Sequence, residues 1–440
     1  MTPEATPHVG NKRVLAIALP IVLSNATVPI LGAVDTGVVG QLGEAAPIGA
    51  VGIGAIILSP IYWIFGFLRM GTVGLTSQAQ GKGEHDEVSA LLSRALLVGL
   101  GGGLLIVLIQ LPLFWGAFQV SPASPEVETL ARDYMAIRVW SAPAAIALYG
   151  ITGWLIAQER TRAVLVVQVW MNGLNILLDL WFVLGLGWGV EGVAIATFLA
   201  EWSGLALGLW FCRSAFKGTA WKDHVRVFDR TRLTRMAVVN GDILVRSVLL
   251  QAIFISFLFW GSGLGDVTLA ANQVLLQFLH ITAYALDGFA FAAEAIVGQA
   301  FGAGAVAAVR RGTILSSIWG GAVAIGLSVV FLIFGPAIID VMTTAPEVRV
   351  AAKGDLGWMV LAPLLGIASW MLDGVFIGAT RTRDMRNMMA ISALIYLSAA
   401  LVLMPMFGND GLWLALLISF VARGITLGLK YPALERAAAA

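Results

Sequence analysis

Charged residues are scarce in this chain, and so are cysteine and histidine. Only 12% of the 440 residues are charged, whereas a soluble protein carries about 25%. The single cysteine excludes an internal disulfide and a cysteine-rich metal site, and the four histidines show no ligand spacing. The net charge of +1 argues against nucleic-acid binding, which needs a basic patch or stripe. The deficit of charge therefore places the chain in a lipid bilayer.

Motifs of ATP-driven pumps and of common enzymes are also missing. No Gly-x-x-x-x-Gly-Lys-Ser/Thr sequence is present, and Lys82 after Gly81 is followed by no nearby serine or threonine. A nucleophile elbow, a His-Glu-x-x-His motif and the kinase motifs are absent as well. We therefore expect that the chain is not an enzyme, that ATP does not drive it directly, and that it needs no cofactor besides a coupling ion.

Long apolar runs are what the sequence does contain. A run of roughly 20 residues crosses a bilayer as a helix. Twelve runs qualify, at about 14–40, 47–78, 90–115, 130–157, 163–184, 190–212, 233–260, 267–299, 312–337, 355–379, 387–407 and 411–430. Strand-like alternation is absent, so we predict an all-α integral membrane protein with twelve transmembrane helices and not a β-barrel.

Short segments of the first half recur 221 residues later. QAQGKG at 78–83 returns as QAFGAG at 299–304, and GWLIAQERTR at 153–162 returns as GVFIGATRTR at 374–383. We predict two six-helix lobes, an N-terminal lobe at 1–212 and a C-terminal lobe at 233–440, joined by a linker at 213–232. Because six is even, both lobes enter the membrane in the same direction. A pseudo-twofold axis along the membrane normal should relate them, as in transporters.

Lysine and arginine gather in one set of loops, and the loop at 213–235 alone holds seven. The opposite loops hold almost none, with Arg349 and Lys353 as exceptions. The positive-inside rule therefore places both termini and the 213–235 loop in the cytoplasm. We expect a multi-pass protein of the inner (cytoplasmic) membrane that is a monomer, binds small molecules and binds no nucleic acid.

Polar side chains of the N-terminal lobe fall into one layer of the membrane. Asp35 lies about one and a half turns before the end of the first run, and Asn175 and Asp179, four apart, share a helix face. Helix directions place Thr197 and Tyr134 at a similar depth. Such oxygen ligands suit a hard cation or a shared proton, because two close carboxylates in a low dielectric resist simultaneous ionisation. For Asp35 alone, the alternative is a helix-end aspartate that reaches the interface.

Proline and glycine weaken the first helix next to this layer. Pro20 and Pro29 each leave a backbone carbonyl without its intrahelical donor. An ordinary kinked membrane helix would show the same pattern. We also predict a bending switch in which the protonation or ion occupancy of Asp35 changes the helix.

Acidic residues also occur in the apolar runs of the C-terminal lobe. Asp242 and Arg246, four apart, are predicted to form a local ion pair. Asp287 and Glu294 share one helix face, and Asp373 lies on another helix. These three carboxylates either line a cavity that attracts a cationic substrate or serve as a gate and in hydrogen bonds between helices. Arg138, Glu201 and Arg423 are predicted to pair between helices or to reach an interface.

Three stretches resemble multidrug and toxic compound extrusion (MATE) transporters, and the DinF-like branch is the most similar. They are LPIVLSNATVPILGAVDTGVVGQLG, GLNILLDLWFVLGLGWGVEGVAIAT and LDGFAFAAEAIVGQAFGAG, at 19–43, 173–197 and 286–304. The resemblance covers essentially the whole chain and implies a V-shaped fold with cation-driven efflux. It implies a cation site at an aspartate of helix 1, an Asn-x-x-x-Asp of helix 5 and a threonine of helix 6, which here are Asp35, Asn175, Asp179 and Thr197. The kinking proline of that branch matches Pro20. In the NorM-like branch, acidic residues of helices 7, 8 and 10 form the cation site, and those helices hold Asp242, Asp287 and Asp373.

The expected function is thus antiport of H⁺ or Na⁺ against lipophilic cationic drugs or toxic metabolites by alternating access. A bound Na⁺ would be held by Asp35, Asn175, Asp179 and Thr197. The alternative is a flippase for lipid-linked intermediates or lipids, as in related two-lobe transporters, although its cavity should be rich in arginine and lysine to meet pyrophosphate. A channel would not need a six-helix duplication with carboxylates inside one lobe.

Overall fold

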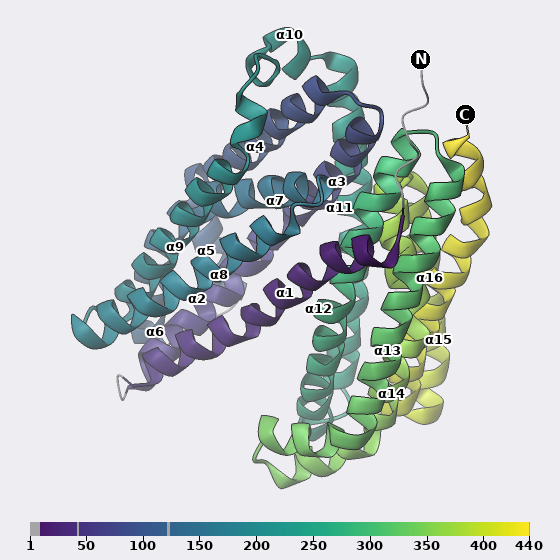
Figure 1. The fold of residues 1–440 in the computed structure, drawn as a ribbon. Helices are drawn as coiled ribbons and strands as arrows, with labels where there is room; N and C mark the ends of the chain where they lie inside the picture. Colours follow the sequence, from purple (N-terminus) through teal and green to yellow (C-terminus); the bar gives the residue numbers. More distant parts are fainter. Residues whose placement is uncertain (1–8, 42–43, 121–123, 440) are drawn as a thin grey trace, which may run out of the picture. The chain divides into compact units, whose positions relative to one another are not determined.

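The computed structural model describes residues 9–41, 44–120 and 124–439, and within these ranges all regular structure is helical (Figure 1). The α-helices are α1 (Asn11–Gly40), α2 (Ala45–Ile64), α3 (Gly66–Gly81), α4 (His85–Leu108), α5 (Gln110–Val120), α6 (Pro125–Arg138), α7 (Ala142–Ala157), α8 (Thr161–Asp179), α9 (Gly189–Phe211), α10 (His224–Val227), α11 (Arg230–Ser262), α12 (Asp266–Gly302), α13 (Val306–Met342), α14 (Pro346–Gly378), α15 (Thr382–Phe407) and α16 (Asn409–Ala438). Short 3-10 turns lie at Val139–Ser141, Arg213–Phe216 and Ala220–Lys222, and a π-helical segment, η2, covers Leu180–Gly185.

Membrane-spanning length recurs along this helical chain. Among the described residues, 12 helical stretches are long and apolar enough to cross a membrane. Four of them join neighbouring elements, namely α2 with α3, α6 with α7, α8 with η2, and α10 with α11. The predicted all-α fold with twelve spans is therefore confirmed.

Internal contacts divide the chain into two compact units. Unit 1 holds the chain through Val22, residues 77–83 and residues 236–440, and unit 2 holds residues 23–76 and 84–235. Helix α1 thus passes from unit 1 into unit 2 two residues after Pro20. The lobe limits expected from the sequence, 1–212 and 233–440, stay a prediction.

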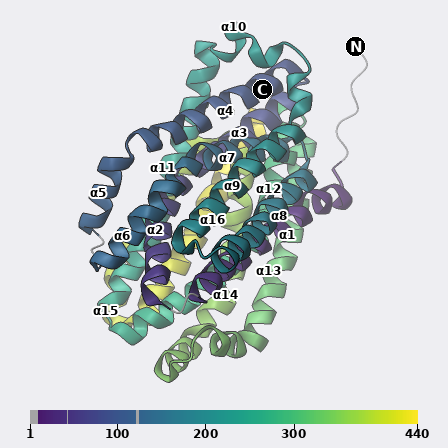
Figure 2. The same ribbon diagram turned by 90° about the vertical axis from the view of Figure 1, so that its left-hand side faces the viewer.

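Glycines allow helices within each unit to pack at short distance. In unit 1, a Cβ on Gly374 of α14 would lie 2.5 Å from the carbonyl oxygen of Ala290 on α12. In unit 2, a Cβ on Gly99 of α4 would lie 2.6 Å from Cα of Ala147 on α7. Figures 1 and 2 show each of these helix pairs side by side. Such close approach is typical of helices that pack in a membrane.

The predicted duplication is visible in the backbone. Glu159 and Thr380, 221 residues apart, have positive φ values of 59° and 49°, and they are the only such non-glycine residues in the described ranges. Each follows the end of a helix, where the next residue donates to a carbonyl five positions earlier, from Arg160 to Leu155 and from Arg381 to Phe376. This is a Schellman turn, which normally takes glycine. Both halves of the chain therefore have the same Schellman turn, although a non-glycine residue occupies its positive-φ position in each.

The repeated QAQGKG and QAFGAG segments contact each other reciprocally within unit 1. A Cβ on Gly81 would overlap the carbonyl oxygen of Gln299, and a Cβ on Gly302 would overlap that of Gln78. The side chain of Gln78 donates to Thr380 Oγ1 at 2.9 Å and to the Gly378 carbonyl at 3.2 Å. We name this arrangement of residues 78–81 and 299–302 the helix-end clasp.

The helix-end clasp leads to a stability prediction. Gly302→Ala should lower the free energy of unfolding by about 1–3 kcal/mol, because the new methyl group meets a backbone carbonyl that cannot move independently. Thermal unfolding of the purified protein in detergent measures this loss. Gly326→Ala is the matched control, since a Cβ at Gly326 meets open space. Equal unfolding midpoints for the two variants would contradict a close contact in the clasp.

The single cysteine is inaccessible to reagents. Cys212 is fully buried just after α9, so that its thiol has no access to solvent. Thiolate is the reactive form of cysteine. Engineered cysteines can therefore be labelled selectively in the otherwise native chain.

Candidate functional site

Helices α1 and α8 run parallel and bring Asp35 and Asp179 together inside unit 2. The Asn172 amide of α8 donates to the Thr27 hydroxyl of α1 at 2.7 Å. Eight residues further along α1 and seven further along α8, the carboxyl groups of Asp35 and Asp179 lie within hydrogen-bonding reach of each other. Two contacts in the same order fix the register of the two helices.

The α-helical geometry of α8 ends at Asp179. The next six residues, Leu180–Gly185, form the π-helical segment η2. Such segments are rare, and they occur frequently at functional sites because they widen the helix and redirect its side chains. Asp179 itself is 0% exposed, so a carboxyl group without access to solvent sits at the point where the helix changes geometry.

Several oxygen atoms around Asp179 have no hydrogen-bond donor. Both carboxylate oxygens of Asp179, Oδ1 of Asp35 and Oδ1 of Asn175 are buried, and no donor in the described part of the chain reaches them. A buried polar group without a partner is destabilising by about 1–3 kcal/mol. A proton or a metal cation among these oxygens would supply the positive charge that the missing hydrogen-bond donors do not. The set of donor-free oxygens fits either ion.

Asn175 and Thr197 connect α8 to α9 beside this group. Asn175 is 1% exposed, and its amide donates to the Thr197 hydroxyl at 3.3 Å. The Thr197 hydroxyl in turn donates to the Val193 carbonyl at 3.0 Å. Because this chain directs the amide nitrogen toward Thr197, it leaves the Asn175 oxygen available for a ligand. The structure therefore brings Asp35, Asn175, Asp179 and Thr197 together. That they bind a coupling cation stays a prediction.

Tyr134 belongs to a charged network next to Asp35. Its buried ring packs against Gly54, and its hydroxyl interacts with Arg138 and with the charge of Asp35. Arg138 forms a two-pronged ion pair with Glu201, at 2.9 and 3.3 Å, which joins α6 to α9 as predicted. The positive charge of Arg138 also acts on Asp35. Glu201 holds Arg138 in a fixed position from which it stabilises negative charge on Asp35.

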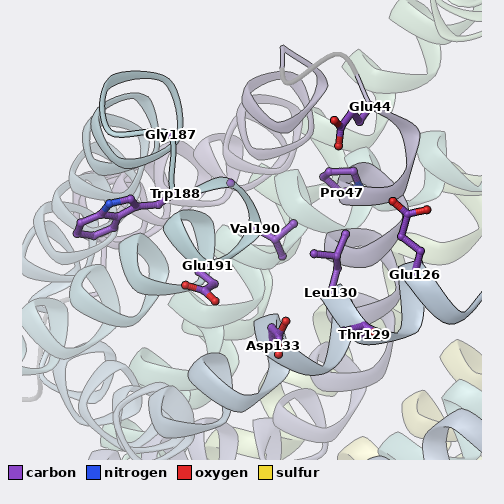
Figure 3. Close-up of a pocket in the computed structure, with 11 residues that line it drawn as sticks. Glu44, Pro47, Glu126, Thr129, Leu130, Asp133, Gly187, Trp188, Val190 and Glu191 are labelled. Carbon is purple, nitrogen blue, oxygen red and sulfur yellow. The ribbon is translucent and has the colours of Figure 1, made fainter.

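A pocket of about 620 Å³ opens in the same unit between the ends of α2, α6 and α9 (Figure 3). Four carboxylates, Glu44, Glu126, Asp133 and Glu191, line it together with Trp188, and no lysine or arginine does. Glu191 precedes Thr197 by six residues on α9, which is about 9 Å along a helix. The pocket is thus a negatively charged vestibule near the Asp35 and Asp179 pair.

Two buried acidic residues of unit 1, Asp242 and Asp373, bind arginines of other helices. The predicted local pair of Asp242 and Arg246 is wrong, because Asp242 binds Arg386 at 2.6 Å and Thr382 at 3.0 Å on α15. Arg246 pairs instead with Asp373 on α14, and Arg423 of α16 lies 3.6 Å from the same carboxylate. Ion pairs between helices therefore form in preference to the local i,i+4 pair within α11.

The other acidic residues predicted to support a cavity lie on α12. Glu294 is buried and Asp287 is half-buried. Asp373 is also buried. A role of these three carboxylates in substrate binding stays a prediction.

Two polar residues of the site, Thr27 and Asn172, were not predicted from the sequence. Thr27 lies eight residues before Asp35, and Asn172 lies seven before Asp179, so that each shares a helix face with its aspartate. Gln168 extends this row by donating to the Asn172 oxygen at 3.0 Å. The heptad spacing from Asp179 back to Asn172 was the signal available in the sequence.

Comparisons with known proteins show the family of the chain. The MatE family model matches residues 20–181 and 243–402. The chain is 39% identical to DNA damage-inducible protein F of Escherichia coli over 433 residues, which cover 95% of this chain and 91% of that protein.

Solved structures show the same fold. Crystal structures of the Vibrio cholerae MATE transporter VcmN, as the D35N mutant and in the bent form, match with TM-scores of 0.88 and 0.87. Each covers 97% of both chains at 19% identity. With twelve spans, a matching family model in both halves and this relative over nearly its whole length, the chain is a multi-pass membrane transporter and not an enzyme, and it belongs to the DinF-like branch of the MATE family.

Proposed function

We propose that this transporter exports lipophilic cationic small molecules in exchange for a cation that binds at Asp35 and Asp179. The observation that carries the proposal is the pair of facing carboxyl groups whose buried oxygens accept no hydrogen bond within the described ranges. A charged group of this kind inside a membrane span is rarely retained without a function. Cation binding supplies that function, because it neutralises the pair.

The direct approach of the two carboxyl groups favours a proton as the coupling cation. Two ionised carboxylates repel each other, whereas a protonated one can donate a hydrogen bond to its partner. Sodium, the other candidate, would take the oxygens of Asp35, Asn175 and Asp179 as ligands, with Thr197 beside them. The two ions therefore use the same residues and differ in whether a metal ion separates the carboxylates.

The charge around the site supports a cationic substrate. The vestibule of Glu44, Glu126, Asp133 and Glu191 contains four carboxylates and no basic lining residue. A concave surface of one charge raises the local concentration of oppositely charged ligands. The same surface disfavours a pyrophosphate headgroup, so this feature speaks against the flippase alternative.

Helix α1 offers a route from ion binding to movement. Pro20 removes an intrahelical hydrogen bond just before α1 crosses from unit 1 into unit 2 at Val22. Proton transfer to Asp35 would let α1 bond to α8, while loss of the proton would release it. The bent form of VcmN motivates the inference that α1 of this chain bends as well. Bending would exchange the ion and the substrate only if they favour different shapes of the helix.

The membrane orientation follows from charge. We infer that both termini and the 213–235 segment face the cytoplasm, since most lysine and arginine residues outside the spans lie on that side. The vestibule would then open to the outside. We also infer a monomer, because each half supplies its own packed helices and the site lies within one unit.

Transport in proteoliposomes tests the proposal. Purified protein is reconstituted, and efflux of a fluorescent lipophilic cation is followed with a pH gradient alone, a sodium gradient alone, or neither. We expect saturable efflux driven by the pH gradient. Efflux that depends only on sodium would assign the site to Na⁺. Unsaturable flux without any gradient would indicate a channel and would overturn the proposal.

Substitutions of the charged residue Asp179 and of the neutral residue Thr197 should reduce efflux to different extents. Asp179→Asn should reduce coupled efflux to that of protein-free liposomes, because the amide can neither carry the proton nor repel Asp35. Thr197→Ala should reduce it by about tenfold or less, the amount expected for one replaceable hydrogen bond. Initial efflux rates, normalised to reconstituted protein, give both values. An inactive Thr197→Ala together with an active Asp179→Asn would show that the site is assigned to the wrong residues.

A further inference from the structure

A second groove lies in unit 2, away from the Asp35 and Asp179 pair. It has a volume of about 340 Å³ and runs between α4 and the chain around α10, which lie side by side in Figures 1 and 2. Leu97 and Leu100 of α4 form one wall, and Trp221 and Phe228 form the other. Among its lining residues, only Ser93, Lys222 and His224 carry polar side chains. The groove is therefore apolar, with a cationic edge.

The apolar wall of the groove continues onto the lipid-facing surface of α4. Leu97 is 51% exposed, and Leu104 and Leu108 are 53% and 73% exposed. These leucines follow a helical repeat on one face of a membrane span. Exposed leucines in a span contact lipid tails. An acyl chain can thus enter the groove from the bilayer without crossing a polar surface.

Hydrogen bonds from Ser93 and Arg94 of α4 hold the two sides of the groove together. Arg94 is fully buried beneath it and donates to the carbonyls of Val227 and Arg226 at 2.8 and 2.6 Å. Ser93 donates to the Trp221 carbonyl at 2.7 Å. These bonds fix the 221–228 backbone against α4. A ligand would consequently meet a preformed surface, which lowers the ordering penalty of binding.

The cations around the groove differ in whether they have partners. Arg94 and Arg232 both pair with Glu87, and Arg226 lies near Asp86. Lys222 lines the groove, whereas Lys217 does not line it but directly follows the lining residue Phe216 in the chain. Both lysines are exposed, and neither pairs with a carboxylate in the described part of the chain. The one acid between them and α10, Asp223, accepts from the backbone of Val225 and Arg226. An unpaired positive charge therefore remains at the edge of an apolar groove.

We propose that this groove binds an anionic phospholipid of the adjacent leaflet. One acyl chain lies along Leu97 and Leu100, and the phosphate lies near Lys222 and Lys217, with His224 beside it. A lipophilic cation would be repelled at this edge, and a neutral phospholipid would leave the two lysines without a counter-charge. An anionic lipid satisfies both the apolar wall and the cations, in the way that basic segments next to spans attract such lipids.

Lipid titration of the purified full chain tests the proposal. Delipidated protein in a non-ionic detergent is titrated with phosphatidylglycerol or with phosphatidylcholine of the same chains, and bound lipid is counted by native mass spectrometry. We expect phosphatidylglycerol to bind more tightly. The double variant Lys217→Gln/Lys222→Gln should bind it roughly thirtyfold more weakly, since each lysine near a membrane surface contributes about 1 kcal/mol. Phosphatidylcholine binding should not change.

Control variants separate this site from a general charge effect. Lys430→Gln removes an exposed lysine of α16 and should leave phosphatidylglycerol binding unchanged. Leu97→Trp should weaken binding of both lipids by filling the groove. Lys222→Arg keeps the charge and should keep the binding. Inorganic phosphate at the same concentration should not compete, because it lacks the acyl chain.

Three results would overturn the lipid assignment. They are equal affinity of the wild type for the two lipids, a loss with Lys430→Gln as large as that with the lysine pair, and full displacement by inorganic phosphate. Size-exclusion profiles and unfolding midpoints are recorded for every variant, and Lys222→Arg and Lys430→Gln keep the comparison valid if the double variant misfolds. The test needs no transport activity, so its outcome is independent of the proposed efflux function.

Discussion

Asp35→Asn should abolish proton-coupled efflux and leave the protein folded. Asparagine has nearly the same size as aspartate but can neither bind a proton nor carry a negative charge at the pH of the assay. The carboxyl of Asp35 faces that of Asp179, so the substitution removes the repulsion that would otherwise drive ion exchange. Efflux driven by a pH gradient in proteoliposomes is expected to fall to the level of protein-free liposomes, with an unfolding midpoint equal to or above that of the wild type.

A matched aspartate elsewhere in the chain provides the control. Asp266 is exposed at the start of α12 and forms no ion pair within the described residues. Asp266→Asn makes the same chemical change and should retain wild-type efflux. Full drug resistance and full coupled efflux in Asp35→Asn would remove Asp35 from the mechanism.

The same substitution should also change the movement of α1. Fluorophores on cysteines replacing Ile30 of α1 and Leu177 of α8, both exposed positions, would report their separation, since the buried Cys212 does not react. In the wild type, lowering the pH should draw the labels together as Asp35 gains a proton and bonds to α8. In Asp35→Asn, the distance between the two labels should not change with pH. If the distance between the labels in the wild type changes with neither pH nor sodium during efflux, the bending switch is excluded.

Helix periodicity and helix direction suffice to predict that these polar side chains lie in one layer. The spacing of Asn175 and Asp179 places them on one face, and the count of residues from each helix end gives the depth. The structure shows Asn175 beside Thr197 and Asp179 beside Asp35. The π-helical segment after Asp179 could not be predicted, because its sequence, LWFVLG, is an ordinary apolar helix sequence.

The sequence does not indicate which of several possible ion-pair partners a charged residue binds in the folded protein. Arg246 lies one helical turn from Asp242, yet it binds Asp373 of another helix, and Asp242 binds Arg386. A local i,i+4 pair is worth only a few tenths of a kcal/mol, so a buried partner at better geometry easily outweighs it. The register of two helices against each other, as between Thr27 and Asn172, depends in the same way on packing that one helix does not encode.

The acidic residues of the two units differ in their electrostatic surroundings. In unit 2, Asp35 and Asp179 face each other, and the buried oxygens of Asp179 have no donor among the described residues. In unit 1, Asp373 faces Arg246 and Arg423, and the Arg423 guanidinium also donates to Ser369 at 3.0 Å. Oδ1 of Asp373 also lacks a donor among the described residues, but the two arginines beside it already balance the charge of this carboxylate. We therefore infer that coupling resides in unit 2, and that Asp373 is a structural partner of the arginines.

Asp373→Asn should consequently destabilise the protein strongly while leaving its coupling mechanism intact. Removing the shared carboxylate leaves two buried arginines without a counter-ion, and breaking a buried ion pair in this way costs about 3–5 kcal/mol. The double variant Arg246→Gln/Asp373→Asn restores the native net charge of this trio and should recover much of the loss. Arg246→Gln alone keeps the Arg423 and Asp373 pair and should be the mildest of the three. Unfolding midpoints in detergent, combined in a double-mutant cycle, measure this order.

Transport by the double variant decides between a structural and a coupling role for Asp373. Once reconstituted at equal protein, Arg246→Gln/Asp373→Asn should show efflux driven by the pH gradient with an unchanged dependence on pH, whereas Asp35→Asn shows none. An uncoupled double variant with wild-type stability would place the coupling cation at Asp373. The opposite charge environments of the two units argue for retained coupling, because a proton adds nothing to a carboxylate that two arginines already neutralise, while it removes the repulsion between Asp35 and Asp179.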